Sequence, residues 1–409
     1  MVFVFSLLFS PFFALFFLLL YLHRYKIKKI HVALSVFLVA FIGIYWYPWG
    51  DNQTHFAIYY LDIVNNYYSL ALSSSHWLYD YVIYHIASLT GQYIWGYYFW
   101  LFVPFLFFSL LVWQIVDEQE VPNKEKWLLL ILLILFLGIR ELLDLNRNTN
   151  AGLFLAIATL LWQKNKALSI TCVIVSLLLH DSIRYFIPFL PFGFILVKQS
   201  QRKTDLIIIL TIIISGFLIK VIAPLVVSER NAMYLEVGGG RGVGSGFMVL
   251  QGYVNILIGI IQYLIIRRNK SVIAKPLYVV YIVSILIAAA LSSMWVGRER
   301  FLLVSNILAT SIILTSWSKL RLVEGVKVLR NFQLIIGSYS MKIIINLLLV
   351  YSAHYVFNSA TTDNQKEFSI VARSFYMPTF MLFDIENYGF SDKKFMNLYD
   401  RVDSTIDGE

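Results

Sequence analysis

Charged residues are scarce in this chain of 409 residues. Only 14% of them are Asp, Glu, Lys or Arg, whereas soluble domains carry about 25%, and 59% of the residues are hydrophobic. The mean hydropathy is +0.71. This composition excludes an ordinary soluble globular protein and indicates a protein that lies in a membrane.

Cysteine is nearly missing as well. The single cysteine, Cys172, lies in an apolar run, so a disulfide framework cannot form within one chain. The first apolar stretch, VFVFSLLFSPFFALFFLLL, has no basic start and no small-residue cleavage site, so we expect a retained helix rather than a signal peptide. The histidines of segment 49–91 lack the i, i+4 spacing of a helical zinc site, so no metal is predicted. No cofactor is expected either.

Apolar runs of membrane-spanning length recur from one end of the chain to the other. They predict an all-α, polytopic membrane protein with about twelve transmembrane helices. The expected spans are roughly 2–22, 30–48, 92–115, 127–140, 151–163, 167–180, 185–197, 206–227, 247–266, 276–296, 301–317 and 333–351. We expect the three short spans that begin at residue 127, 151 or 167 to be tilted or half-buried.

The predicted organisation is a single multi-spanning domain over residues 1–351 and an external tail over residues 352–409. Two longer external segments interrupt the domain. Segment 49–91 is expected to form amphipathic helices at the membrane interface, and the glycine-rich loop 228–246 is expected to be a mobile lid.

The basic residues are divided unevenly between the two sets of loops. One set is rich in lysine, which predicts that it faces the cytoplasm: HRYKIKK, KEK, KNK, KQSQRK, RRNK and 318–332. Before the C-terminal tail, the opposite set uses arginine instead: Arg140, Arg147, Arg184, Arg230, Arg241, Arg298 and Arg300. A single arginine often serves as an interfacial anchor, but seven on one side favour an anion-binding cavity, because guanidinium binds phosphate or carboxylate bidentately. Topology and an anionic ligand therefore explain the net charge of +9 without nucleic acid.

Several polar groups at predicted outer span ends are candidates for chemistry. Segment 49–91 mixes Asp and His with many aromatic residues, and Asp51 is the first choice of carboxylate. In RELLDLNRNTNAG, Arg140, Asp144, Arg147 and Asn148 would share roughly one helical face. Such a row either satisfies itself as an ion network or lines a functional cavity.

A second polar group, LLLHDSIRY, contains His180 and Arg184. Histidine exchanges protons near neutral pH. A Ser-His-Asp triad is excluded because three adjacent side chains point in different directions and no G-x-S-x-G motif is present. Later, Arg298 and Arg300 flank Glu299, and their i, i+2 spacing predicts that only one of them reaches a shared cavity.

These residues resemble motifs of the EpsG family of exopolysaccharide polymerases, relatives of the Wzy-type O-antigen polymerases. WGDN at 49–52 is similar to an early external G-x-D-Y motif without its tyrosine. NRNTNAG offers Arg147 and Ala151 of an Arg-Gln-x-x-Ala motif, with Asn148 in place of glutamine. LLHDSIRYFIPF resembles a His-x-Ser-Ala motif with Ile183 in place of alanine, and Arg298 or Arg300 matches a late arginine that leads a helix.

The resemblance implies a GT-C-like glycosyltransferase, a polysaccharide polymerase that transfers a polyprenyl-diphosphate-linked glycan onto a lipid-linked repeat unit. The reaction would take place at the outer face of the bacterial cytoplasmic membrane, without a metal. The implied catalytic residues are Asp51, Arg147 and His180. The implied substrate-binding residues are Arg140, Asn148, Arg184, Arg241, Arg298 and Arg300. The expected partners are undecaprenyl-diphosphate-linked oligosaccharide, membrane lipid and a chain-length regulator, with no nucleic acid.

Three other classes of membrane protein stay open on sequence. An O-antigen ligase would share the lipid-linked donor and the arginines but would use another acceptor. A flippase or transporter of lipid-linked oligosaccharide would be expected to show repeat symmetry and charges near mid-membrane. A membrane acyltransferase would use a histidine but would not need seven external arginines.

Overall fold

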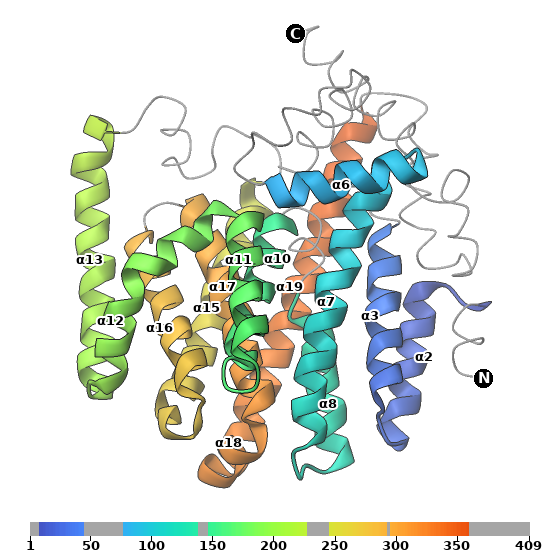
Figure 1. Cartoon of the computed structure of the whole chain (residues 1–409), viewed down its shortest axis with the longest axis horizontal. Coiled ribbons are helices and arrows are strands. Elements are labelled where there is room, and N and C mark those ends of the chain that lie inside the picture. Colours follow the sequence, from blue (N-terminus) through green and yellow to red (C-terminus); the bar gives the residue numbers. More distant parts are fainter. Residues whose placement is uncertain (1–7, 45–76, 138–145, 227–244, 293–294, 360–409) are drawn as a thin grey trace, which may run out of the picture. The chain divides into compact units, whose positions relative to one another are not determined.

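The structure is a computed structural model, and it describes residues 8–44, 77–137, 146–226, 245–292 and 295–359 (Figure 1). Within these ranges the chain forms fourteen α-helices and two short 3-10 helices, and it has no strand there. The predicted all-α class is therefore confirmed.

Each predicted span overlaps a helix of the structure. These helices are α2 (Pro11–Arg24), α3 (Lys29–Ile44), α7 (Ile94–Asp117), α8 (Asn123–Leu135), α10 (Asn146–Leu161), α11 (Lys166–Leu179), α12 (Phe186–Lys198), α13 (Gln201–Val226), α15 (Ser245–Arg268), α16 (Lys275–Ala290), α17 (Trp295–Thr315) and α19 (Val326–Ser359). The remaining elements are α6 (Trp77–Thr90), η1 (Asp181–Tyr185), η2 (Lys270–Val272) and α18 (Trp317–Glu324).

The structure identifies fewer clear membrane spans than the sequence predicts. Among the described residues, α7 alone is long and apolar enough to cross a bilayer by itself. Two bent pairs pass the same test together, α11 with α12 and α17 with α18, which allows up to three spans. The protein is thus a helical membrane protein, while the twelve spans and the GT-C-like architecture stay predictions.

The chain divides into two compact units. The first comprises Met1–Asn150 with Tyr351–Glu409, and the second comprises Ala151–Val350. Helix α10 begins in the first unit and continues into the second. The predicted division into a membrane domain and a tail is not tested by this result, because residues 360–409, which are most of the tail, lie outside the described residues.

Helices α2, α3, α7 and α8 pack together in the first unit. Helix α7 supplies much of its core, with Phe105, Phe108 and Trp113 fully buried. The indole Nε1 of Trp127 on α8 donates a hydrogen bond to the carbonyl oxygen of Leu19 on α2, at 2.7 Å. Aromatic and aliphatic residues fill this unit because long apolar helices bury them on every side.

Helix α6 lies across the N-terminal end of α7 (Figure 1). It buries the face formed by Tyr79, Asp80, Ile83 and Ala87, as an amphipathic helix does. Gly96 of α7 permits the close approach, because a Cβ atom there would lie 2.6 Å from the Cα atom of Ile83. The crossing of α6 and α7 therefore depends on a residue without a side chain.

In the second unit, α16 contacts α12, α13 and α17. Gly193 lets α12 approach α16, since a Cβ atom at this position would lie 2.5 Å from Cγ2 of Val283. Hydrogen bonds between side chains join α15, α17 and α19. Gln262 Nε2 donates to Thr310 Oγ1 at 3.2 Å and to Tyr339 Oη at 2.9 Å. Small residues and polar contacts of this kind are what hold helices together in lipid.

Candidate functional site

Arg147 and the aromatic residues of α6 and α7 form one candidate site in the first unit. The guanidinium carbon of Arg147 lies over the Tyr79 ring, 6.0 Å from its centroid. The Tyr79 ring stacks on Trp100 at 5.4 Å with an interplanar angle of 17°, and Trp100 Nε1 donates to the Tyr79 carbonyl oxygen at 3.2 Å. We call Tyr79, Asp80, Trp100, Arg147 and Asn148 the Tyr79 cluster.

The first turn of α10 consists of polar residues, and all of them except Arg147 are buried. Asn146, Asn148, Thr149 and Asn150 are each 2% exposed or less, whereas Arg147 is half-buried. Asn150 Nδ2 donates to Asn146 Oδ1 at 2.6 Å. The amide groups of a helix N-terminus carry partial positive charge, which favours a nearby anion. Arg147 and the start of α10 therefore provide positive charge at one place.

Asp80 is a member of this cluster that sequence reasoning passed over in favour of Asp51. It is only 3% exposed and lies in the first turn of α6. Burial raises the pKa of the neighbouring Tyr79 phenol, Arg147 lowers it, and the Asp80 carboxylate raises it. Burial is the largest of these effects, so the pKa of the Tyr79 phenol lies above its ordinary value. The signal available in the sequence was that Asp80 shares a helical face with Ile83 and Ala87.

His180 occupies a sharp break between two helices of the second unit. Helix α11 and the segment Ser182–Lys198 meet at 119°, and His180 lies in the break. Its own N–H donates to the Ser176 carbonyl oxygen at 3.3 Å. Broken helices at membrane depth are tolerated where the irregular backbone is buried in protein or lines a cavity, and such breaks often bind ligands.

The side chain of His180 is held by the backbone that follows it. Its Nδ1 accepts a hydrogen bond from the Ser182 N–H at 3.0 Å, and the residue is 7% exposed. Since Nδ1 is an acceptor, the proton of the neutral imidazole lies on Nε2. In this geometry His180 is a hydrogen-bond donor through Nε2.

The turn after His180 packs against the start of α17. The ring of Phe301 lies 5.8 Å from that of Phe186 and 6.3 Å from that of Tyr185. These contacts bring the segment containing exposed Arg184 beside the first turns of α17, which carry the half-buried Arg298 and Arg300. We call these three arginines with His180 the His180 cluster.

Small residues of α10 also support the His180 cluster. Ser176 Oγ on α11 donates to the Ala151 carbonyl oxygen at 2.6 Å. A Cβ atom at Gly152 would lie 2.8 Å from Cδ1 of Ile307 on α17. Helix α10 therefore packs closely on both α11 and α17 within the second unit, which fixes the helices from which His180 and the α17 arginines project.

The remaining predicted site residues, Asp51, Arg140 and Arg241, lie outside the described residues. Within the described part of the chain, no group of three His, Cys, Asp or Glu side chains is placed to hold a metal ion. Independence from metal stays a prediction.

Comparison with protein-family models finds a match to the EpsG family over residues 28–329. The matched range covers more than half of the chain and includes both clusters. No curated protein and no solved structure matches the chain.

Proposed function

Because this chain belongs to the EpsG family, the family of Wzy-type polysaccharide polymerases, we propose that it extends a polysaccharide on a lipid carrier. In the proposed reaction a hydroxyl group of a lipid-linked repeat unit attacks the anomeric carbon of a polyprenyl-diphosphate-linked glycan. The bond from that carbon to the diphosphate oxygen breaks, and undecaprenyl diphosphate leaves. The reaction takes place at the outer face of the bacterial cytoplasmic membrane.

The observation that carries this proposal is the position of Arg147. Its guanidinium group is positioned over the buried Tyr79 ring at the N-terminus of α10. Negative charge develops on the diphosphate as it leaves, and a donor that is already in place stabilises this charge without the cost of reorganisation. The amides of the first turn of α10 add to the same effect. In this proposal Asn148, which is buried, supports the start of the helix beside Arg147.

The acid and base roles follow from the protonation of His180. Its Nδ1 is occupied by the Ser182 N–H, so its Nε2 donates a hydrogen bond to a substrate oxygen rather than removing a proton. The acceptor hydroxyl then gives its proton to a carboxylate. Asp51 and Asp80 are the candidates for this base, and a substitution of each by asparagine separates them.

Both substrates of the proposed reaction carry a diphosphate. Two binding sites for anions are therefore needed, and the chain has two groups of arginines. Arg147 serves one diphosphate, and Arg184 of the His180 cluster serves the other together with whichever of Arg298 and Arg300 reaches the shared cavity. Guanidinium suits this role because its planar fork matches phosphate oxygens.

The test is reconstitution of the purified protein in liposomes. The substrate is the lipid-linked repeat unit extracted from cells that lack the gene for this chain, in which unpolymerised substrate accumulates. A ladder of lengthened glycans on a gel is the expected result. A single transfer of glycan to another acceptor would instead assign a ligase. Movement of substrate across the bilayer without a new glycosidic bond would assign a transporter and overturn the proposal.

A further inference from the structure

Positively charged residues gather at one end of the second unit. Here the α12–α13 loop with its flanking helix ends, residues 198–203, meets the α15–α16 loop with its flanking helix ends, residues 267–270. Four of the positively charged residues are exposed and two are half-buried. We call the following residues the cationic corner: Lys198, Arg202, Lys203, Arg267, Arg268 and Lys270. One acid, Asp205, lies among them, so the corner has a net charge of +5, six cations less one carboxylate. It takes no part in the proposed transfer reaction.

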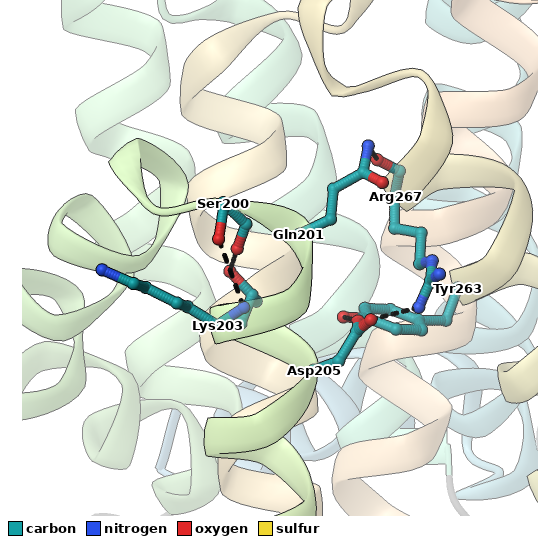
Figure 2. Close-up of polar contacts among 7 residues, drawn as sticks. Ser200, Gln201, Lys203, Asp205, Tyr263 and Arg267 are labelled. Atoms are coloured by element: carbon teal, nitrogen blue, oxygen red, sulfur yellow. Dashed lines mark hydrogen bonds and ion pairs between the residues drawn. The ribbon is translucent and has the colours of Figure 1, made fainter.

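Direct contacts hold the two loops of the cationic corner together (Figure 2). Gln201 Nε2 donates to the Arg267 carbonyl oxygen at 2.8 Å. Lys270 Nζ donates to the Gln199 carbonyl oxygen, also at 2.8 Å. The two loops therefore present their charges from one fixed surface rather than from two independent ones.

The carboxylate of Asp205 is bound by groups of α15. Tyr263 Oη donates to its Oδ1 at 2.8 Å, and Arg267 Nη1 forms an ion pair with its Oδ2. Figure 2 shows Lys203 extending away from this pair. Arg267 and Asp205 thus neutralise each other, and the exposed cations around them keep their charge for a ligand.

An apolar surface begins directly beside the cationic corner. Helix α13 exposes a series of large aliphatic side chains from its second turn onward: Leu206, Ile207, Ile209, Leu210 and Ile213. An anionic phospholipid matches this arrangement, because its negatively charged phosphate would lie at the cations and its two acyl chains would lie against the aliphatic side chains. The lysine-rich loops to which the corner belongs are also the ones predicted to face the cytoplasmic leaflet, where anionic lipids are concentrated.

From this arrangement we propose that the cationic corner binds the headgroup of an anionic phospholipid, whose acyl chains lie along α13. Arg202 and Arg268 offer exposed guanidinium forks to the phosphate oxygens. The lysines add charge that is less directional. Ordinary positive-inside topology requires only that basic residues lie in this loop set. A binding site also requires that they be held together, as the hydrogen bonds of Gln201 with Arg267 and of Lys270 with Gln199 hold them.

The proposal is tested by native mass spectrometry of the full-length protein in detergent, titrated with phosphatidylglycerol or with neutral phosphatidylcholine. The first variant is Arg202→Gln with Lys203→Gln. The matched control is Lys327→Gln with Arg330→Gln, which removes the same two charges from exposed positions elsewhere in the predicted cytoplasmic loops. The first variant should bind phosphatidylglycerol about tenfold more weakly, with phosphatidylcholine binding unchanged, and the control should bind both lipids like the wild type.

Other outcomes overturn the proposal. Equal losses in both variants would mean that net charge alone attracts the lipid. No loss in the first variant would place the lipid elsewhere, and competition by millimolar inorganic phosphate at the same site would assign it to free phosphate. Circular dichroism and gel filtration confirm that each variant is folded. Because the measurement is of lipid binding, its failure leaves the proposed polymerase activity untouched, and the reverse holds as well.

Discussion

Replacement of Arg147 by lysine tests whether a fixed guanidinium is needed in the Tyr79 cluster. The substitution keeps the positive charge but removes the planar fork. Its effect on folding should be small, because Arg147 is half-buried and its contact with Tyr79 is at 6.0 Å, near the far end of the cation–π range. Such a contact is worth about 0.5–1 kcal/mol, and lysine retains part of it.

The effect on catalysis should be larger. Removal of one preorganised donor from a site of developing negative charge costs about 10²–10³-fold in rate, or about 2.7–4 kcal/mol. The expected loss of transition-state stabilisation therefore exceeds the expected loss of folding stability several-fold. We expect Arg147→Lys protein to fold, to melt within a few degrees of the wild type, and to make polymer at least a hundredfold more slowly.

The assay combines the liposome reaction with thermal unfolding followed by intrinsic fluorescence. Arg330→Lys is the matched control, since this exposed arginine lies in a loop predicted to face the cytoplasm. It should polymerise at the wild-type rate. Polymer formation at the wild-type rate by both Arg147→Lys and Arg147→Ala would refute the assignment. A loss of activity that simply follows a loss of folded protein would show that Arg147 acts only on stability.

Two further predictions concern His180 and the crossing of α6 and α7. In His180→Asn, the amide oxygen replaces Nδ1 as acceptor for the Ser182 N–H, so the protein should fold. It should lose transfer activity, because asparagine has no counterpart of the Nε2 donor. Wild-type activity in this variant would exclude the donor role. Gly96→Ala places a Cβ atom 2.6 Å from the Cα atom of Ile83 and should destabilise the protein by about 1–3 kcal/mol. Gly337→Ala has nothing within 4 Å and should not lower the melting temperature; an equal fall in both variants would mean that the close contact is not the cause.

The amino-acid sequence by itself determined the secondary structure and the family. Long apolar runs can satisfy their backbone groups in a membrane only as helices, so helices lie where spans were predicted. Arg147, His180 and the residues around them were enough to indicate the EpsG family, which the family model matches. Both conclusions depend on local patterns, and local patterns can be read along a chain.

Only the tertiary structure decided which distant residues meet. Arg147 lies over Tyr79, and Phe301 joins the turn after His180 to the start of α17. Asp80 was passed over because the contacts that mark this site are made by its neighbour Tyr79 with Trp100 of α7 and Arg147 of α10, and no spacing along the chain predicts them. The polar residues between the predicted spans 167–180 and 185–197 indicated a break at His180, but its angle of 119° is set by tertiary packing and is seen only in the structure.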